Sequence, residues 1–152
     1  MLVGVGIPAR HRFQLFILYG EIMKLIGYIT YKVFYSTNLK QDLIFNSNAL
    51  NVIDLFCLDE DDFSVDITGA TVIFIVKEKP TDLDTAAKIN KAITSLTDPT
   101  NGNTLIEIES TECDDLLGNY IYELRIAMPT SGEEYILKQG NITFSKSLYG
   151  IV

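Results

Sequence analysis

The chain is 152 residues long, and 47% of its residues are hydrophobic and 21% are charged. This length and composition fit one globular domain with a substantial core and exclude an intrinsically disordered chain. The net charge of −8 argues against nucleic-acid binding, because phosphate contacts require a surplus of lysine and arginine.

The charge is unevenly distributed between a basic N-terminal region and an acidic remainder. Residues 1–40 carry five bases and one acid, a net charge of +4, whereas residues 41–152 carry the other seven bases and 19 acids, a net charge of −12. Residues 1–38 are also rich in apolar and aromatic side chains. We predict an extended arm over 1–38 that either lies on its own domain or docks on a neighbouring subunit. The residues expected at such an interface are Arg10, Arg12, Phe13, Phe16 and Tyr19.

The apolar N-terminal run is not expected to cross a membrane. Glu21 and Lys24 interrupt it before it reaches a spanning length, and no small-residue cleavage site of a signal peptide follows Arg10-His11-Arg12. Met23 leaves open a second interpretation, in which residues 1–22 are an upstream extension of a protein whose compact part begins later.

From residue 42 onwards, short apolar runs alternate with turn residues, which is typical of β-strands. Residues 85–94 fit a short helix or a solvent-facing strand, and we favour the strand. Residues 110–119 are predicted to form a loop, and residues 138–140 a bulge or bend. The expected strands are 42–45, 51–58, 70–76, 88–93, 104–109, 120–126, 134–137 and 141–145. Seven or eight short strands with turns between them predict an all-β sandwich or small barrel.

Two groups of residues resemble ligand or redox motifs, and we interpret both as structural. The acidic turn Asp59–Asp62 continues with Phe63 and Ser64, where a calcium loop needs a ligand and a glycine, so a solvated hairpin tip is expected. Calcium binding through other ligands is left open. Cys57 and Cys113 lack C-x-x-C spacing, which favours two buried or idle thiols over a disulfide and gives no support to a metal site.

The sequence contains no catalytic constellation. Its one histidine, His11, lies in the predicted arm, so it offers neither a histidine pair for zinc nor a Ser-His-Asp set. There is no glycine-rich phosphate loop, and the paired carboxylates fall in turns without the apolar pocket that would raise a pKa for acid catalysis. We therefore predict a protein that is not an enzyme and that holds no cofactor or metal.

Residues 115–120 have the D-x-x-G-x-Y form of a tyrosine corner. In that feature a tyrosine at the start of a late strand of an immunoglobulin-like sandwich donates its hydroxyl back to the backbone. The predicted members are Asp115, Gly118 for the tight turn, and Tyr120 for the hydroxyl. A plain turn followed by an aromatic strand residue is the alternative, and both interpretations are structural.

The order of these pieces resembles immunoglobulin-like modules of bacteriophage structural proteins, including the N-terminal domain of the phage baseplate upper protein family. Residues 66–72 match the D-[LI]-T-G-A-T-V signature of those modules, and residues 118–126 match their G-x-Y-x-Y-E-L-R-I run. Residues 134–137 and 140–144 continue the match, so that order and spacing agree over 39–152. Residues 1–38 are not covered.

The resemblance implies an immunoglobulin-like antiparallel β-sandwich of seven to eight strands over 39–152, preceded by the arm at 1–38. It implies a non-enzymatic structural component of a phage virion, such as a tail, baseplate, neck or connector adapter. Its partners would be other virion proteins and copies of itself. Because the chain ends soon after the sandwich, a capsid decoration protein and a head-fibre anchoring protein are alternatives. Two further alternatives are a host-surface-binding module, acting through loops 59–66, 80–84 and 98–103, and a secreted bacterial adhesive domain.

Overall fold

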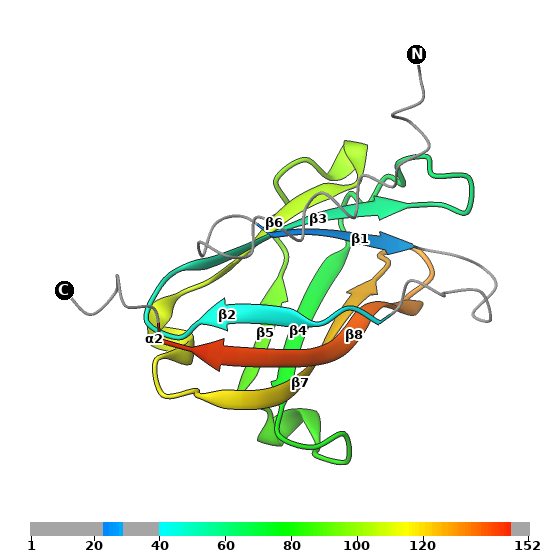
Figure 1. Cartoon of the computed structure of the whole chain (residues 1–152). Coiled ribbons are helices and arrows are strands. Elements are labelled where there is room, and N and C mark those ends of the chain that lie inside the picture. The colour runs from blue at the N-terminus through cyan, green and yellow to red at the C-terminus, as the bar shows by residue number, and fades with distance from the viewer. Residues whose placement is uncertain (1–22, 29–39, 147–152) are drawn as a thin grey trace.

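The computed structural model describes residues 23–28 and 40–146, and within them two β-sheets pack face to face (Figure 1). This architecture confirms the predicted all-β sandwich. The described residues form eight strands, but β1 was not among the expected strands, and the expected strands 134–137 and 141–145 are one strand. The strands are β1 (Met23–Tyr28), β2 (Leu43–Asn46), β3 (Asn51–Leu58), β4 (Thr71–Lys77), β5 (Ile89–Ile93), β6 (Asn103–Ile108), β7 (Gly118–Ala127) and β8 (Glu134–Ser145).

The strand order is that of an immunoglobulin-like sandwich. The smaller sheet has the order β1-β3-β6, and the larger sheet has the order β2-β8-β7-β4-β5. The run β8-β7-β4-β5 corresponds to strands G, F, C and C′ of the immunoglobulin arrangement, and the pair β3-β6 corresponds to strands B and E. Two edge pairings depart from the predicted antiparallel arrangement, because β1 runs parallel to β3 and β2 runs parallel to β8.

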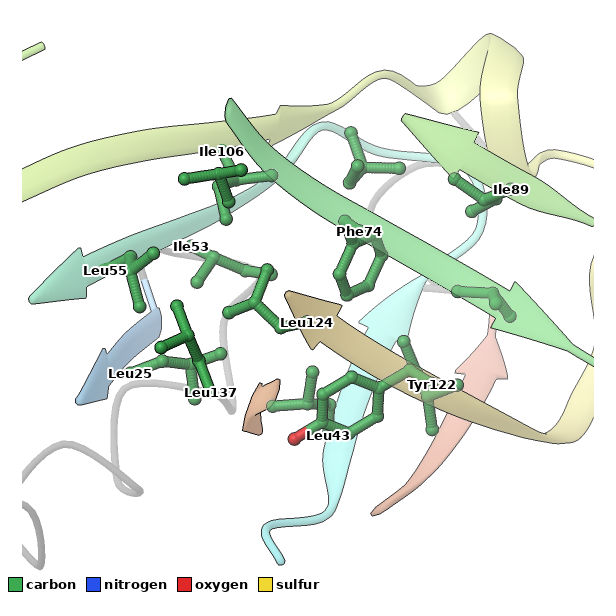
Figure 2. Close-up of a cluster of buried hydrophobic side chains, with 14 of the residues drawn as sticks. Leu25, Leu43, Ile53, Leu55, Phe74, Ile89, Ile106, Tyr122, Leu124 and Leu137 are labelled. Atoms are coloured by element: carbon green, nitrogen blue, oxygen red, sulfur yellow. The ribbon is translucent and has the colours of Figure 1, made fainter. Parts of the chain in front are cut away.

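Period-two alternation sends one face of each central strand into the core. Burial alternates along the whole of β3, and in β7 the side chains of Tyr122, Leu124 and Ile126 are buried. Aromatic rings fill the middle of the sandwich: Phe74 lies 5.9 Å from Phe45 between ring centroids and 5.9 Å from Tyr122. Such ring pairs contribute about 0.5–1.5 kcal/mol each beyond their buried area. Figure 2 shows Phe74, Leu124 and Tyr122 together in this core.

Strand β1 falls inside the region predicted as an arm. It pairs with β3, and Leu25 is fully buried, so this part of the arm lies on its own domain. Gly27 makes the close approach possible, since a Cβ at that position would stand 2.8 Å from the Cβ of Leu137. The predicted interface residues lie outside the described residues, and so their role stays a prediction: Arg10, Arg12, Phe13, Phe16 and Tyr19.

The predicted loop at 110–119 begins with a short helix, α2 (Ser110–Cys113). Glu109 and Glu112 form a reciprocal capping box, in which the Glu109 N–H donates to the Glu112 carboxylate at 2.8 Å. A glutamate in place of the usual serine or threonine at the cap hides this signal in the sequence. Elsewhere β5 confirms the strand interpretation of 85–94, and a 3-10 turn at Asp84–Ala86 precedes it.

The bulge predicted at 138–140 occurs slightly earlier, inside one continuous strand. Leu124 pairs with Lys138, whereas Arg125 pairs with Ile136, so Leu137 is the extra residue in β8. Leu137 and Lys138 are consequently both buried although they are adjacent. The bulge turns Leu137 toward β1, where it meets Gly27.

The predicted turn at 98–103 closes on Gly102, which has a φ of +70°. Its carbonyl oxygen accepts a hydrogen bond from the Cys57 N–H at 2.7 Å. A Cβ at this position would lie 2.7 Å from the carbonyl oxygens of both Cys57 and Val65. The turn is therefore fastened to β3 at a point where only glycine fits.

We expect Gly102→Ala to lower the free energy of unfolding by about 2–4 kcal/mol, from left-handed strain plus a backbone clash. Gly132 is the matched control, because its φ is +67° but nothing lies within 4 Å of the position that a Cβ would take there. Gly132→Ala should cost only the conformational part, about 1–2 kcal/mol. Urea unfolding of both variants measures the difference, and equal losses would contradict the account.

Candidate functional site

The outer face of the larger sheet carries the candidate site, and strand register decides which residues lie there. Val72, Phe74 and Val76 of β4 point into the core, so Ile75 and Lys77 point outward. Across the β4–β7 ladder, Ile73 pairs with Arg125, Ile75 with Glu123 and Lys77 with Ile121. The outer face is thus a mixture of isoleucines and charged side chains.

Asp84, in the loop after β4, bridges two cations of this face. Its Oδ1 lies 2.7 Å from Lys77 Nζ, and its Oδ2 lies 3.0 Å from Arg125 Nη1. Lys77 Nζ also donates to the Asp82 carbonyl oxygen at 2.7 Å, and Arg125 Nε pairs with Glu123. These contacts hold the loop against the sheet, and Ile75 is only 2% exposed although it points away from the core.

The network fixes the charge state of its members. Hydrogen bonds from Arg125 and then from Lys77 lower the pKa of Asp84 from 3.8 to about 2. The hydrogen bond with Asp84 raises the pKa of Arg125, and Glu123 adds to this effect. Asp84 and Arg125 are therefore both ionised at neutral pH and act as a permanent clamp.

Between this loop and the segment 40–42 the outer face is hollowed by a depression of about 400 Å³. Ile75 and Ile121 contribute to its apolar lining. Its charged residues are of both signs: Lys40, Lys77 and Arg125 are cations, and Asp42 and Glu123 are anions. Its volume lies within the range of about 300–1,000 Å³ that is usual for binding pockets.

The far wall of the depression is locked to β8 through the backbone of Gln41. The Gln41 N–H donates to the Gln139 carbonyl oxygen at 3.0 Å, and Tyr122 donates its hydroxyl to the Gln41 carbonyl oxygen at 2.5 Å. Asp42 accepts a hydrogen bond from the Asn141 N–H at 3.0 Å. A Cβ at Gly140 would lie 2.5 Å from the Gln41 carbonyl oxygen, so this glycine permits the contact.

The structure describes all three residues of the predicted tyrosine corner, around the start of β7. Gly118 has a φ of +92° at the start of β7, Asp115 is exposed, and the Tyr120 ring packs edge-on against Phe144 at 5.6 Å between centroids. Within the described residues, the β7 tyrosine that bonds to the backbone is Tyr122. Because side chains alternate along a strand, Tyr122 lies on the same face as Tyr120. This alternation is the signal in the sequence that could have identified Tyr122. The tyrosine corner itself stays a prediction.

The other groups singled out in the sequence are buried thiols and an exposed loop. Burial raises the pKa of the Cys57 thiol to about 12, and burial followed by nearby acids raises that of Cys113 to about 11. Both thiols are free and stay protonated at neutral pH, which makes them poor nucleophiles. In the loop after β3, Asp59 accepts hydrogen bonds from the N–H groups of Asp61 and Phe63. Among the residues that the structure describes, no group of three or more candidate ligands is placed to hold a metal ion.

Asp84→Asn should lower the free energy of unfolding at pH 7 by less than about 1 kcal/mol, the usual worth of a partly exposed ion pair. The folded pKa of Asp84 lies below its ordinary value of 3.8, so the contribution is present above a pH of about 4 and is lost as the pH falls toward about 2. Urea unfolding across this range should show the wild type and the variant converging. Asp61→Asn, which removes an exposed carboxylate outside the ion pairs of the described residues, should show no such trend.

Tyr122→Phe should lower the free energy of unfolding by about 1–2 kcal/mol, because it removes a hydrogen bond to a backbone carbonyl beneath the depression. Tyr120→Phe is the comparison and should change it by less than about 0.5 kcal/mol. Thermal or urea unfolding of the two variants measures this. A larger loss for Tyr120→Phe would instead support the tyrosine corner predicted from the sequence.

No protein-family model and no curated protein matches the sequence. No helix within the described ranges is long and apolar enough to span a membrane. Among solved structures, the fold is similar to that of the N-terminal domain of phage TP901-1 ORF48, with a TM-score of 0.50 and 8% identity over 83% of this chain and 100% of that one. A cysteine protease inhibitor from Entamoeba histolytica, EhICP2, is matched at a TM-score of 0.33 and 11% identity, over 80% of this chain and 97% of the inhibitor. The chain thus shares its sandwich fold with a domain of a phage protein.

Proposed function

We propose that the protein is a non-enzymatic structural component of a phage virion, a tail, baseplate, neck or connector adapter that works through protein–protein contacts. The observation that carries this proposal is the likeness of fold to the N-terminal domain of a phage protein over the full length of that domain. The motifs at 66–72 and 118–126, which resemble those of phage structural modules, agree with this proposal. In the fold these motifs lead into β4 and form most of β7, the two central strands of the larger sheet.

The chemistry of the described residues supports a structural role over a catalytic one. The carboxylate with the most displaced pKa value, Asp84, is held between two cations and has no proton to exchange at neutral pH. The two thiols are buried and protonated. These groups stabilise the fold. Acid–base catalysis requires a carboxyl pKa raised toward neutral pH, and nucleophilic catalysis requires a thiol pKa lowered toward it, whereas the pKa values of these groups are displaced in the opposite directions.

The depression on the larger sheet is the surface best suited to a partner protein. It combines an apolar lining with a charged border on a rigid sheet, which is the composition of many protein–protein contacts. An adapter in a virion would use such a surface to contact other virion proteins or further copies of itself.

Mass spectrometry of purified phage particles tests the proposed location. Particles from a host that carries the gene should contain the chain in a fixed ratio to the major capsid protein. Separated tails and heads then distinguish a tail or neck adapter from a capsid decoration protein. Detection of the chain in the lysate but not in the particles would refute the proposal.

A cell-binding assay separates the adapter from a host-surface-binding module. The purified full chain should not bind to host cells, because an adapter contacts other subunits. Saturable binding to cells that lack the phage would favour the host-binding alternative.

A further inference from the structure

The turn between β5 and β6 contains the one Asn-Gly pair of the sequence, Asn101-Gly102. Asparagine is a chemically labile residue, and a following glycine increases the lability because it leaves its backbone nitrogen unhindered. In spontaneous deamidation the Gly102 nitrogen attacks the side-chain carbonyl carbon of Asn101 and closes a succinimide ring. The side-chain nitrogen leaves as ammonia and takes the backbone proton with it. Water then opens the ring at either carbonyl and gives aspartate or isoaspartate.

The Asn101 side chain is exposed to water, but the turn holds the two reacting groups apart. The Gly102 N–H donates to the Pro99 carbonyl oxygen at 3.0 Å, so the attacking nitrogen is already engaged. The side-chain nitrogen of Asn101 donates to both carboxylate oxygens of Asp98, at 3.1 and 3.0 Å. Asn101 is the last residue of a 3-10 turn, and its side chain leans back toward Asp98 and away from the nitrogen that follows it.

The rest of the fold keeps this turn closed. The Gly102 carbonyl oxygen accepts a hydrogen bond from the Cys57 N–H of β3 at 2.7 Å. Asp98 and Asn103 exchange two backbone hydrogen bonds of 3.0 Å across the turn. A group held in this way reacts only during the fraction of time in which the local structure is open. Ring closure at Asn101 therefore requires that the turn come away from β3.

We propose that Asn101 is a conditional modification site, which deamidates when the 98–103 turn opens and keeps its amide while the turn is fastened to β3. The inference goes beyond the proposed function and is independent of it, because it depends on the chemistry of this chain alone and on no partner.

Conversion of Asn101 prevents the turn from regaining its closed form. An aspartate at this position has no N–H to donate to Asp98, and two carboxylates at that distance repel each other. Isoaspartate adds an atom to the main chain directly before Gly102, where a Cβ would already lie 2.7 Å from two carbonyl oxygens. The modified chain is therefore less stable than the original one.

Peptide mapping by mass spectrometry tests the proposal on the full chain, incubated at mildly alkaline pH either folded in buffer or unfolded in guanidinium chloride. Deamidation at Asn101 should be roughly tenfold or more slower in the folded chain. Equal rates in the two states would overturn the proposal.

Asp98→Ala tests the contact that holds the side-chain amide. It removes the carboxylate but leaves the backbone hydrogen bonds of the turn, so the folded variant should deamidate roughly fivefold faster than the wild type, the effect of one hydrogen bond. Asp61→Ala removes an exposed carboxylate from another loop and should keep the wild-type rate. All three chains should react equally fast in guanidinium chloride. An Asp98→Ala rate equal to that of the folded wild type would contradict the role given to this contact.

Asn101→Asp supplies the reaction product directly and should lower the guanidinium chloride midpoint of unfolding. Asn119→Asp is the matched control. It adds the same charge at an exposed position of β7, where the side-chain oxygen accepts a hydrogen bond from the Thr143 hydroxyl and a carboxylate accepts it equally well. Its midpoint should stay close to that of the wild type. If the two variants lose the same amount, the product does not disturb the turn as proposed.

Discussion

The pairing of β4 with β7 at the centre of the larger sheet determines both the core and the outer surface. In this register Phe74 lies opposite Leu124 on the inner face, and Ile75 lies opposite Glu123 on the outer face. A slip of one residue would exchange the two faces and expose the aromatic core. The depression therefore depends on the same alternation that buries Phe74, and it cannot be formed without the folded sandwich.

Local patterns made the strands predictable. β3 spans Asn51–Leu58, the range expected from its apolar run, and β4 and β7 follow the turns before them. The parallel pairing of β1 with β3 was not predictable, because it joins segments far apart in the chain and has no turn to mark it. The bulge in β8 places Leu137 beside Gly27 of β1, a contact that alternation alone does not reveal.

The candidate site was much less visible in the sequence than the fold. The clamp joins Asp84 to Arg125 across 41 residues, and Tyr122 reaches Gln41 across 81. Each of these residues resembles an ordinary surface or strand position in the sequence, and only the register of the sheet brings them together. From the sequence, the N-terminal arm was predicted to make the subunit contacts. The described part of that arm is β1, which contributes Leu25 to the core.

The edges of the larger sheet are poorly suited to recruiting a partner strand. β2 has only four residues, and β5 carries Lys91, whose Nζ donates to the Glu107 carbonyl oxygen at 2.6 Å and pairs with Glu112 at 2.8 Å. A lysine that ties an edge strand to the opposite sheet hinders addition of another strand there. With the sheet edges protected in this way, the side chains of the faces and loops, such as the exposed Phe63, are the groups accessible to other molecules.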